Sequence, residues 1–253
     1  MSFYVIIPAR LASTRLPNKP LADIGGKPMI VRVAEQAAKS GAADIIVATD
    51  DSTIVDACAV HNVKAVLTRK DHVSGTDRIA EVASRMDWAD DATIVNVQGD
   101  EPLIDPTLIA ATASLISETV PMSTAAHALE APEDIFNPNY VKVVLDKNSR
   151  ALYFSRAAIP WYRDGYAKPE KQYPSLTALR HVGLYAFRND FLKRYSSLTV
   201  SPIEQIESLE QLRVLWHGYP IAVHVTDRIP EAGVDTPADL ERIRQTYARF
   251  HQS

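Results

Sequence analysis

Residues 3–21 read FYVIIPARLASTRLPNKPL, and this stretch decides how the chain folds. Tyr4–Ile7 is a short apolar run with the length and composition of a buried strand. We expect Pro8 to end that strand, because proline has no amide hydrogen to donate to a sheet ladder. A polar loop follows, and its cations and hydroxyls are Arg10, Ser13, Thr14, Arg15 and Lys19. The pattern predicts an open α/β sheet, in which ligands bind beyond the carboxyl ends of the strands.

The cations of this loop predict a binding site for a triphosphate. Arginine can bind phosphate oxygens through two parallel hydrogen bonds, and lysine adds a compact, movable charge. A solvated basic loop is the alternative, but the position directly after a buried strand and the stiffening by Pro17 and Pro20 favour phosphate binding. No glycine run precedes Lys19, so the loop is neither a Walker loop nor a dinucleotide fingerprint. Side chains, more than backbone amides, must therefore bind the phosphates.

The segment PARLASTRLPNKPL, residues 8–21, resembles the signature loop of the sugar cytidylyltransferases. Over nearly its whole length the chain is similar to the 3-deoxy-manno-octulosonate cytidylyltransferase (CMP-Kdo synthetase) family. This resemblance implies a three-layer α/β nucleotidyltransferase fold with a mixed, mainly parallel sheet. It also implies that CMP is transferred from CTP to the sugar acid Kdo for lipopolysaccharide synthesis, with Mg²⁺ as cofactor and a homodimer as the assembly.

Length and composition are those of an ordinary globular protein. Of the 253 residues, 46% are apolar and 23% are charged. We expect a single domain with a nucleotide-binding part at about 1–128, a sugar-binding and dimerisation part at about 129–228 and a C-terminal metal motif and helix at 229–253. A net charge of −4 argues against a nucleic-acid binder held by bulk charge.

The single cysteine and the absence of long apolar runs predict a cytoplasmic protein. Cys58 cannot form an internal disulfide, which fits a reducing compartment, and its expected place on a helix at 52–61 favours a buried structural thiol. The first apolar run is only a strand long and charged residues follow it, so no signal peptide is expected. No run reaches the length of a membrane span, so no membrane insertion is expected.

Alternating apolar segments predict strands and helices along the rest of the chain. The expected helices are at 29–40, 52–61, 79–86, 105–116, 201–215 and 237–250, with another beginning at 191. The expected strands are at 44–49, 63–68, 93–97, 122–128, 141–145, 152–156, 180–187 and 221–225. A segment at 162–177 has two prolines, three tyrosines and no periodicity, so we expect it to form a flap.

Two further polar motifs predict a magnesium site. Asp100 follows the expected strand 93–97, where a carboxylate would lie beside the triphosphate loop; a common Gly-Asp turn is the alternative. Asp235 precedes Thr236 and Pro237, which suit the start of the last helix, so an N-terminal cap could account for it. Mg²⁺ takes hard oxygen ligands and needs only one or two carboxylates, because waters and phosphates complete the octahedron. Asp235 is expected as the remote partner of Asp100.

The segment RKDHVSGTDR, residues 69–78, is expected beside the nucleotide. Ser74-Gly75-Thr76 can bring amides and hydroxyls close to a ligand, while Asp77 suits a helix start. A capping turn explains Asp77 but leaves Arg78 without a role. His72 is expected to be a solvated loop histidine. Asp50 and Asp51, after the strand 44–49, could meet a ribose or base, or could cap the next helix; the sequence does not separate these alternatives.

The resemblance assigns roles to individual residues. It implies that the catalytic residues are Arg15, Lys19, Asp100 and Asp235, with both aspartates holding the metal. The nucleotide-binding residues that it implies are Pro8, Ala9, Arg10, Ser13, Arg15, Lys19, Ser74, Thr76 and Arg78. The sugar-binding residues that it implies are Gln98, Arg156, His181, Tyr185 and Glu210.

Local patterns around the sugar-binding residues allow other readings. His181 and Tyr185 fall on one face of the expected strand 180–187, where they could bind a sugar or could form a structural pair. Arg156 could be an ordinary surface arginine, and most charges on the helix 201–215, Glu207 and Glu210 included, could simply be solvated.

The sequence also allows other substrates and another class of function. The sugar could be 8-amino-Kdo or a sialic acid, because such a swap changes few residues. A uridylyl- or guanylyltransferase would need a different base pocket. A regulatory protein that binds CTP without turnover would bind the nucleotide and release no pyrophosphate.

Overall fold

The computed structural model describes residues 2–12, 15–168, 171–174 and 178–250. Internal contacts divide the chain into two compact units. The first comprises Met1–Ser114, Leu184–Ser196 and Pro230–Ser253, and the second comprises Leu115–Gly183 and Ser197–Ile229. Strand β10 (Leu179–Arg188) has residues in both units. The division into nucleotide-binding and sugar-binding parts stays a prediction.

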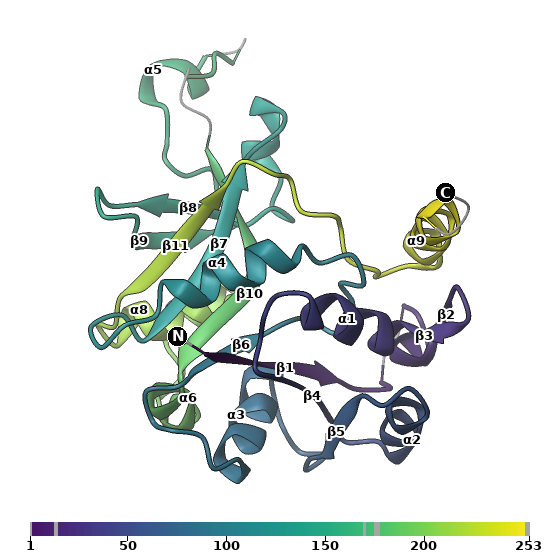
Figure 1. Cartoon of the computed structure of the whole chain (residues 1–253). Helices are drawn as coiled ribbons and strands as arrows, with labels where there is room; N and C mark the ends of the chain where they lie inside the picture. The colour runs from purple at the N-terminus through teal and green to yellow at the C-terminus, as the bar shows by residue number, and fades with distance from the viewer. Residues whose placement is uncertain (1, 13–14, 169–170, 175–177, 251–253) are drawn as a thin grey trace. The chain divides into compact units, whose positions relative to one another are not determined.

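The first unit is built on a mainly parallel sheet with the order β10-β6-β1-β4-β5 (Figure 1). Its strands are β1 (Phe3–Ala9), β4 (Asp44–Thr49), β5 (Lys64–Leu67), β6 (Thr93–Asn96) and the later residues of β10. β1 lies parallel to both β4 and β6, whereas β10 runs antiparallel to β6. Val5, Ile6 and Ile7 are fully buried, as expected for a parallel strand covered on both faces.

Helices cover both faces of this sheet and complete three layers. The helices of the unit are α1 (Met29–Ala38), α2 (Ser52–Val60), α3 (Gly75–Arg85), α4 (Pro106–Ser114), α6 (Asn189–Tyr195) and α9 (Pro237–Phe250). α1 packs beside α4, and α3 packs beside α6 on the other face (Figure 1). A 3₁₀ turn, η1 (Lys19–Leu21), and a small ribbon of β2 (Asp23–Ile24) and β3 (Lys27–Pro28) precede α1. The α/β fold class and the mixed, mainly parallel sheet predicted from the sequence are confirmed.

Pro8 does not end the first strand, contrary to the expectation. β1 continues to Ala9, and Pro8 pairs in register with Ala48 of β4. The carbonyl of Ile6 accepts a hydrogen bond from the amide of Val97, on the β6 side. Residues two apart along a strand point their backbone groups to the same neighbour, so the nitrogen of Pro8 also faces that side. β6 has already ended at Asn96, and the missing amide hydrogen therefore breaks no ladder hydrogen bond.

Side-chain caps fix where the helices of this unit begin. Asp51 accepts a hydrogen bond from the amide of Thr53 at 2.8 Å and so caps α2, which is one of the two roles predicted for it. Ser74, rather than Asp77, accepts from the backbone at the start of α3. Thr236 and Asp239 accept from each other's amides at the start of α9. Cys58 is buried on α2, as predicted, and burial raises the pKa of its thiol to about 11.

The second unit combines a parallel strand pair with an antiparallel hairpin. Its strands are β7 (Met122–Ala128), β8 (Lys142–Leu145), β9 (Ala151–Ser155), β11 (Ile221–Thr226) and the first residues of β10. β11 lies parallel to β7, and β8 lies antiparallel to both β9 and β10. The helical segments are η2 (Pro132–Phe136), α5 (Arg163–Tyr166), α7 (Pro202–Glu207) and α8 (Gln211–Trp216).

The single helix predicted at 201–215 is wrong, because the structure has two. A capping box starts the first of them: Ser201 accepts from the amide of Glu204, and the Glu204 carboxylate accepts from the amide of Ser201. Ser208 then adopts a left-handed conformation with φ 52°, which ends α7. The apolar spacing continues across that residue, so the periodicity alone did not reveal the break.

Two other details of this part differ from the prediction. Arg163–Tyr166 of the expected flap forms a helical turn, and residues 169–170 and 175–177 lie outside the described residues. The alternation predicted for 180–187 stops at Gly183, because Leu184–Phe187 are buried without exception. None of the helices within the described residues combines the length and the hydropathy that crossing a bilayer requires.

Candidate active site

A cavity of about 460 Å³ opens at the carboxyl ends of the parallel strands of the first unit. Its walls come from the signature loop, the segment before α3, the loop after β6 and the residue that precedes α9. The lining residues are Pro8, Ala9, Arg10, Ala12, Arg15, Lys19, Pro20, His72, Val73, Ser74, Gly75, Arg78, Gln98, Gly99, Asp100 and Asp235. All three polar motifs predicted from the sequence therefore meet in one place.

Lys19 joins the two predicted metal ligands. Its Nζ donates to Oδ2 of Asp100 at 2.6 Å and to Oδ1 of Asp235 at 3.1 Å, across 216 residues of sequence in the second case. Arg15 also approaches Asp235, with Nη2 at 3.1 Å from Oδ1. η1 places Lys19 here, after Asn18 has turned the chain in a left-handed conformation with φ 55°. Two carboxylates thus converge on one position that a cation already occupies.

The remaining cation of the signature loop lies at the open side of the cavity. Arg10 is exposed and lines the cavity, and the side chain of Arg15 is 67% exposed. Lys19 is far less accessible, with 16% of its side chain exposed. Ser13, which was predicted to bind nucleotide, lies outside the described residues. A polyanion that entered this cavity would meet two accessible guanidiniums first and a largely buried ammonium further in.

Gly99 allows the loop after β6 to approach the end of β1. A Cβ atom built on Gly99 would lie 2.7 Å from the carbonyl oxygen of Pro8, a contact that real Cβ atoms do not make. Any larger residue would push apart the two loops that carry Asp100 and the signature cations. The sequence pattern placed Gly99 in a turn and did not reveal this close approach.

Glu101 is a titratable group at this site that the sequence analysis did not single out. Burial, and to a lesser degree the neighbouring Asp100 carboxylate, raise the pKa of Glu101 to about 8. At neutral pH its carboxyl group is therefore mainly protonated and adds little negative charge beside Asp100. Perturbed groups of this kind concentrate at functional sites.

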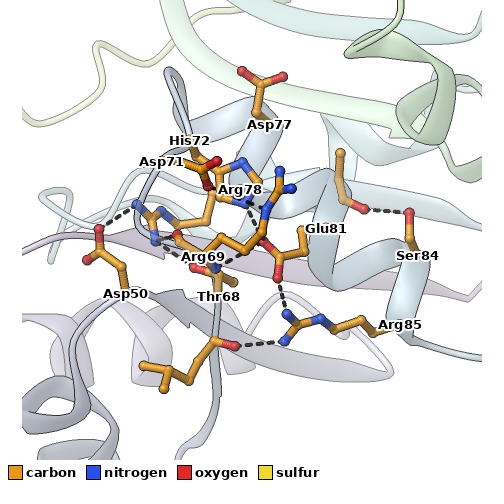
Figure 2. Close-up of polar contacts among 12 residues, drawn as sticks. Asp50, Thr68, Arg69, Asp71, His72, Asp77, Arg78, Glu81, Ser84 and Arg85 are labelled. Carbon is orange, nitrogen blue, oxygen red and sulfur yellow. Dashed lines mark hydrogen bonds and ion pairs between the residues drawn. The ribbon is translucent and has the colours of Figure 1, made fainter.

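Arg78 lines the cavity and is held by its neighbours (Figure 2). Its Nη2 donates to Oδ2 of Asp50 at 2.9 Å, and Nη1 donates to Oγ1 of Thr68 at 2.5 Å. Only 5% of the Arg78 side chain is exposed. Asp50, which was predicted either to meet a ribose or base or to cap a helix, instead forms an ion pair that fixes a cavity residue.

His72 lines the same wall and is not the solvated histidine that was expected. Only 5% of its side chain is exposed, and its Nε2 is hydrogen-bonded to Oε2 of Glu81 on α3 (Figure 2). Burial tends to raise the pKa of Glu81, but the hydrogen bonds from His72 and from the amide of Arg69, with the charge of Arg85, lower it overall. The relevant signal in the sequence was Glu81, one helical turn from Asp77 and Arg78 on the same helix.

The other predicted nucleotide-binding residues differ in their relation to the cavity. Pro8, Ala9 and Ser74 line the cavity, and a Cβ atom built on Gly75 would touch the ring of Pro8. Thr76 is buried in the first turn of α3, and it is not one of the described residues that line the cavity.

Two of the predicted sugar-binding residues belong to the first unit. Gln98 lines the cavity next to Gly99 and Asp100. Tyr185 is buried on β10 and pairs in register with Asn96, two residues before Gln98. Oδ1 of Asn96 is buried and has no hydrogen-bond partner among the described residues. Buried amide oxygens normally accept a hydrogen bond, so Oδ1 of Asn96 is an acceptor at the end of β6 that a donor could still reach.

Arg156 of the second unit is anchored by Glu207. Oε2 of Glu207 accepts from the backbone amide of Arg156 at 2.9 Å, and its backbone carbonyl accepts from Nε of Arg156 at 2.8 Å. Ser155 donates to the other carboxylate oxygen at 2.5 Å. Glu207, for which sequence left a solvated role open, therefore orients the strand end that carries Arg156.

His181 of the second unit is a half-buried, neutral imidazole. Its Nε2 lies 3.0 Å from Oγ1 of Thr124, and its ring meets Phe154 edge to face at 5.0 Å between centroids. Burial lowers the pKa of His181 to about 3. The ring can thus donate or accept hydrogen bonds at neutral pH but carries no charge. Glu210 stands at the start of α8 and makes no side-chain cap there.

The donor set of the cavity fits a hard divalent cation. Asp100 and Asp235 supply two carboxylates at one point, and no cluster of three or more potential metal-ligating side chains is found within the described ranges. Mg²⁺ commonly binds to one or two carboxylates and takes its other ligands from water and phosphate. The site therefore suits a metal that arrives with a nucleotide better than a metal held by the protein alone.

Sequence comparison relates the chain to cytidylyltransferases. A family model described as cytidylyltransferase matches residues 4–227. The chain is 69% identical over 250 residues to a 3-deoxy-manno-octulosonate cytidylyltransferase of Herminiimonas arsenicoxydans, and the match covers 98% of this chain and all of that protein.

Structural comparison agrees with the sequence. A CMP:2-keto-3-deoxy-manno-octonic acid synthetase, solved in complex with CTP, superposes with a TM-score of 0.89 and 41% identity, over 99% of this chain and all of the other. A cytidylyltransferase from Leptospira borgpetersenii has the same fold, with a TM-score of 0.62 and 15% identity over 99% of this chain and 88% of the other.

Proposed function

This chain belongs to the cytidylyltransferase family, and from that premise we propose that it transfers CMP from CTP to 3-deoxy-manno-octulosonate (Kdo). The products are CMP-Kdo and pyrophosphate, and the activated sugar serves lipopolysaccharide synthesis. The observation that carries the proposal is the convergence of Arg15, Lys19, Asp100 and Asp235 in one cavity at the carboxyl ends of the parallel strands.

To catalyse this reaction, the protein must position the two substrates and neutralise the negative charge of the phosphates. The anomeric oxygen of the sugar attacks the α-phosphorus in line, the bond from that phosphorus to pyrophosphate breaks, and the hydroxyl proton is lost. Little covalent work falls to protein side chains in such a transfer. We assign Arg10 and Arg15 to the outer phosphates, because they are the accessible cations of the loop.

Lys19 is assigned to the charge that develops during the transfer. Its ammonium is the least exposed cation of the signature loop and already contacts both aspartates. A preorganised charge in a partly dry site stabilises a transition state more effectively than a mobile surface charge does. When the aspartates are engaged by another cation, Lys19 is free to turn to the phosphates.

Asp100 and Asp235 are the residues that would hold Mg²⁺. When bound, the ion neutralises phosphate charge and lowers the pKa of the attacking hydroxyl.

The residues assigned to the sugar acid are each proposed on separate evidence. Gln98 lines the cavity, and Tyr185 lies on β10 opposite the end of β6. Arg156 is the cation we assign to the sugar carboxylate, because Glu207 holds it in place and His181 is neutral. His181 and Glu210 are assigned to hydroxyl groups of the sugar.

The experiment that tests the proposed function is pyrophosphate release with CTP and Mg²⁺, with Kdo compared with 8-amino-Kdo. We expect release with Kdo. Release with the amino sugar alone would move the enzyme to that substrate, and a panel of nucleoside triphosphates would expose a uridylyl- or guanylyltransferase. CTP binding with no release from either sugar would instead support a regulatory protein without turnover.

We also propose a homodimer formed through the second unit. Apolar side chains stay exposed there, among them Leu152 on β9 and Val225 on β11. Exposed apolar residues that gather on one part of a protein are typical of interfaces. Sedimentation of the unchanged protein and of Leu152→Glu tests this: a shift of the variant to the monomer is expected, and an unchanged monomeric mass in both would overturn the assignment.

A further inference from the structure

His72 has no role in the proposed reaction, yet it forms part of the cavity wall. It belongs to the segment between β5 and α3, and it is nearly buried. Val73, the next residue, also lines the cavity and is largely exposed there. A buried histidine ring beside a ligand cavity either holds the segment in place or meets the ligand, and its hydrogen bonds distinguish these roles.

Glu81 fixes the orientation of the His72 ring. The carboxylate lies on α3, outside the cavity lining, and accepts from Nε2 of His72 and from the backbone amide of Arg69. Arg85, one turn further along α3, donates to the other oxygen of the same carboxylate (Figure 2). Nε2 of His72 is thereby directed away from the cavity. Nδ1 makes no hydrogen bond with any residue that the structure describes.

The tautomer follows from this arrangement. A carboxylate accepts hydrogen bonds only, so Nε2 of His72 must carry the proton. In the neutral ring Nδ1 is then an acceptor, because only one of the two nitrogens is protonated. The cavity wall therefore presents a hydrogen-bond acceptor at this point.

The position of His72 corresponds to the base of a nucleotide and not to its phosphates. The phosphate end of the cavity is set by Asp100, in the loop after β6, and His72 lies in the loop after β5. β6 and β5 are not neighbours in the order β6-β1-β4-β5, and the loop after β5 returns to β1 only at Gly75, where an added Cβ atom would touch the ring of Pro8. His72 precedes Gly75 by three residues and so lies on the β5 side of the cavity, where a nucleoside would lie if its triphosphate were held beside Asp100.

We propose that His72 is a specificity-determining residue whose Nδ1 accepts a hydrogen bond from the exocyclic amino group of the cytosine, and that Glu81 is the residue that positions it. The inference rests on the proposed use of CTP at this cavity. Uracil carries an oxygen at the corresponding position, and an oxygen would meet the Nδ1 lone pair without a proton between them. The pair would therefore favour CTP over UTP.

A matched pair of substitutions tests this. The amide of asparagine can place an oxygen near the position of Nδ1, whereas the amide of glutamine reaches the position of Nε2 and so keeps only the contact with Glu81. We expect His72→Gln to reduce the ratio of CTP to UTP affinity on the order of tenfold, the size of one neutral hydrogen bond. His72→Asn should retain more of that ratio. Equilibrium binding of CTP and of UTP at a fixed pH, without sugar, is the readout.

Glu81→Gln tests the positioning role, and Arg85→Gln is its control. Loss of the carboxylate should lower the CTP preference, and raise KM for CTP more than it changes kcat, since the ring would no longer be held in one tautomer. Arg85→Gln removes a different partner of Glu81 and leaves His72 and the amide of Arg69 in place, so it should keep the CTP preference.

The outcomes separate this inference from the proposed function. The inference is overturned if the ratio of CTP to UTP affinity is the same in the unchanged protein and in a folded His72→Gln variant. It is also overturned if His72→Asn loses more of that ratio than His72→Gln, because His72 would then only hold the segment in place. A wild-type protein that binds CTP but releases no pyrophosphate with Kdo would overturn the proposed function, while the binding ratios would still decide the role of His72.

Discussion

At the scale of single residues, one ammonium group determines how charge is arranged in the cavity. Lys19 compensates Asp100 and Asp235 together, so neither carboxylate is left without a cation while the ligand is absent. Only Lys19 is largely shielded, with 16% of its side chain exposed against 32% for Asp100 and 50% for Asp235, so the pairing offsets the cost of removing its ammonium from water. If Asp100 and Asp235 held a metal ion instead, Lys19 would be available to the phosphates.

Lys19→Ala should therefore impair turnover more than CTP binding. Loss of one preorganised electrostatic contact typically lowers kcat by about 10²–10³-fold, and we expect a change of that order with a smaller rise in KM for CTP. Pyrophosphate release at varied CTP measures both constants. Lys64→Ala removes an exposed lysine outside the cavity and is the control. If kcat held and only KM rose, Lys19 would contribute to ground-state binding alone.

Asp100→Asn and Asp235→Asn should each nearly abolish activity at ordinary Mg²⁺ concentrations. An amide keeps the shape of the side chain but removes the charge that a hard divalent cation prefers. Calorimetric titration of Mg²⁺ in the presence of CTP should show weakened binding in both variants, which gives a readout that does not depend on turnover. Asp44→Asn, at the far end of β4, is the matched control. Near-normal turnover in either variant would contradict the paired site.

At the scale of elements, helix caps and ion pairs decide where segments of the second unit begin and end. The box of Ser201 and Glu204 starts α7, and the Glu204 carboxylate also accepts two hydrogen bonds from Arg213 of α8, at 2.6 and 2.9 Å. One carboxylate thus joins two short helices that Ser208 separates. α8 begins directly after Glu210, so this junction also sets the position of a residue assigned to the sugar.

Ser201→Ala should lower the free energy of unfolding by about 1 kcal/mol, because an amide at the start of α7 loses its acceptor. Urea denaturation at neutral pH measures the change. Ser52→Ala replaces an exposed serine at the first position of α2 and should have little effect. A loss in Ser201→Ala no larger than in this control would mean that the Glu204–Arg213 pair holds the junction without the serine.

Local patterns predicted most of these elements but not the contacts that modify them. β4, β7 and α9 have the predicted bounds, since apolar spacing and caps are properties of neighbouring residues. The continuation of β1 through Pro8 depends on where β6 ends, and the burial of His72 depends on Glu81. Such facts come from residues that are distant along the chain or on another element.

The same limit applies to the site. Each polar motif was visible in the sequence, but spacing alone could not show that Asp235 meets Lys19 across 216 residues. The resemblance to a family supplied that pairing. Roles that no motif carried, those of Asp50 and Glu101, emerged only from the ion pair with Arg78 and from burial beside Asp100.

At the scale of the whole molecule, the net charge is negative, whereas the signature loop at the cavity is positively charged. The chain carries a net charge of −4, and both proposed substrates are anions. The overall field therefore does not attract them, and the exposed guanidiniums of Arg10 and Arg15 must provide the attraction at short range. Such short-range attraction selects molecules that carry phosphate over anions in general.

Stability of the whole chain should also depend on pH through His181. Its folded pKa of about 3 lies below the ordinary unfolded value of about 6.5, so the unfolded state binds the extra proton between those values. Unfolding then becomes easier as the pH falls through that window, and the neutral ring adds no such penalty above it. At pH 5 the penalty should reach about 2 kcal/mol.

His181→Gln isolates this contribution, because glutamine keeps a polar side chain but does not titrate. Urea denaturation measures the free energy of unfolding of both proteins at pH 8 and at pH 5. The difference between the proteins at pH 8 reports the packing against Phe154 that the variant loses, and it is subtracted from the difference at pH 5. We expect the variant to lose less free energy of unfolding between these values than the unchanged chain. Fluorescence and far-UV circular dichroism should be recorded together, because two compact units need not unfold in one step. Parallel losses in both proteins would mean that His181 can take up a proton in the folded state, and a charged imidazole would then share the binding of the sugar carboxylate with Arg156.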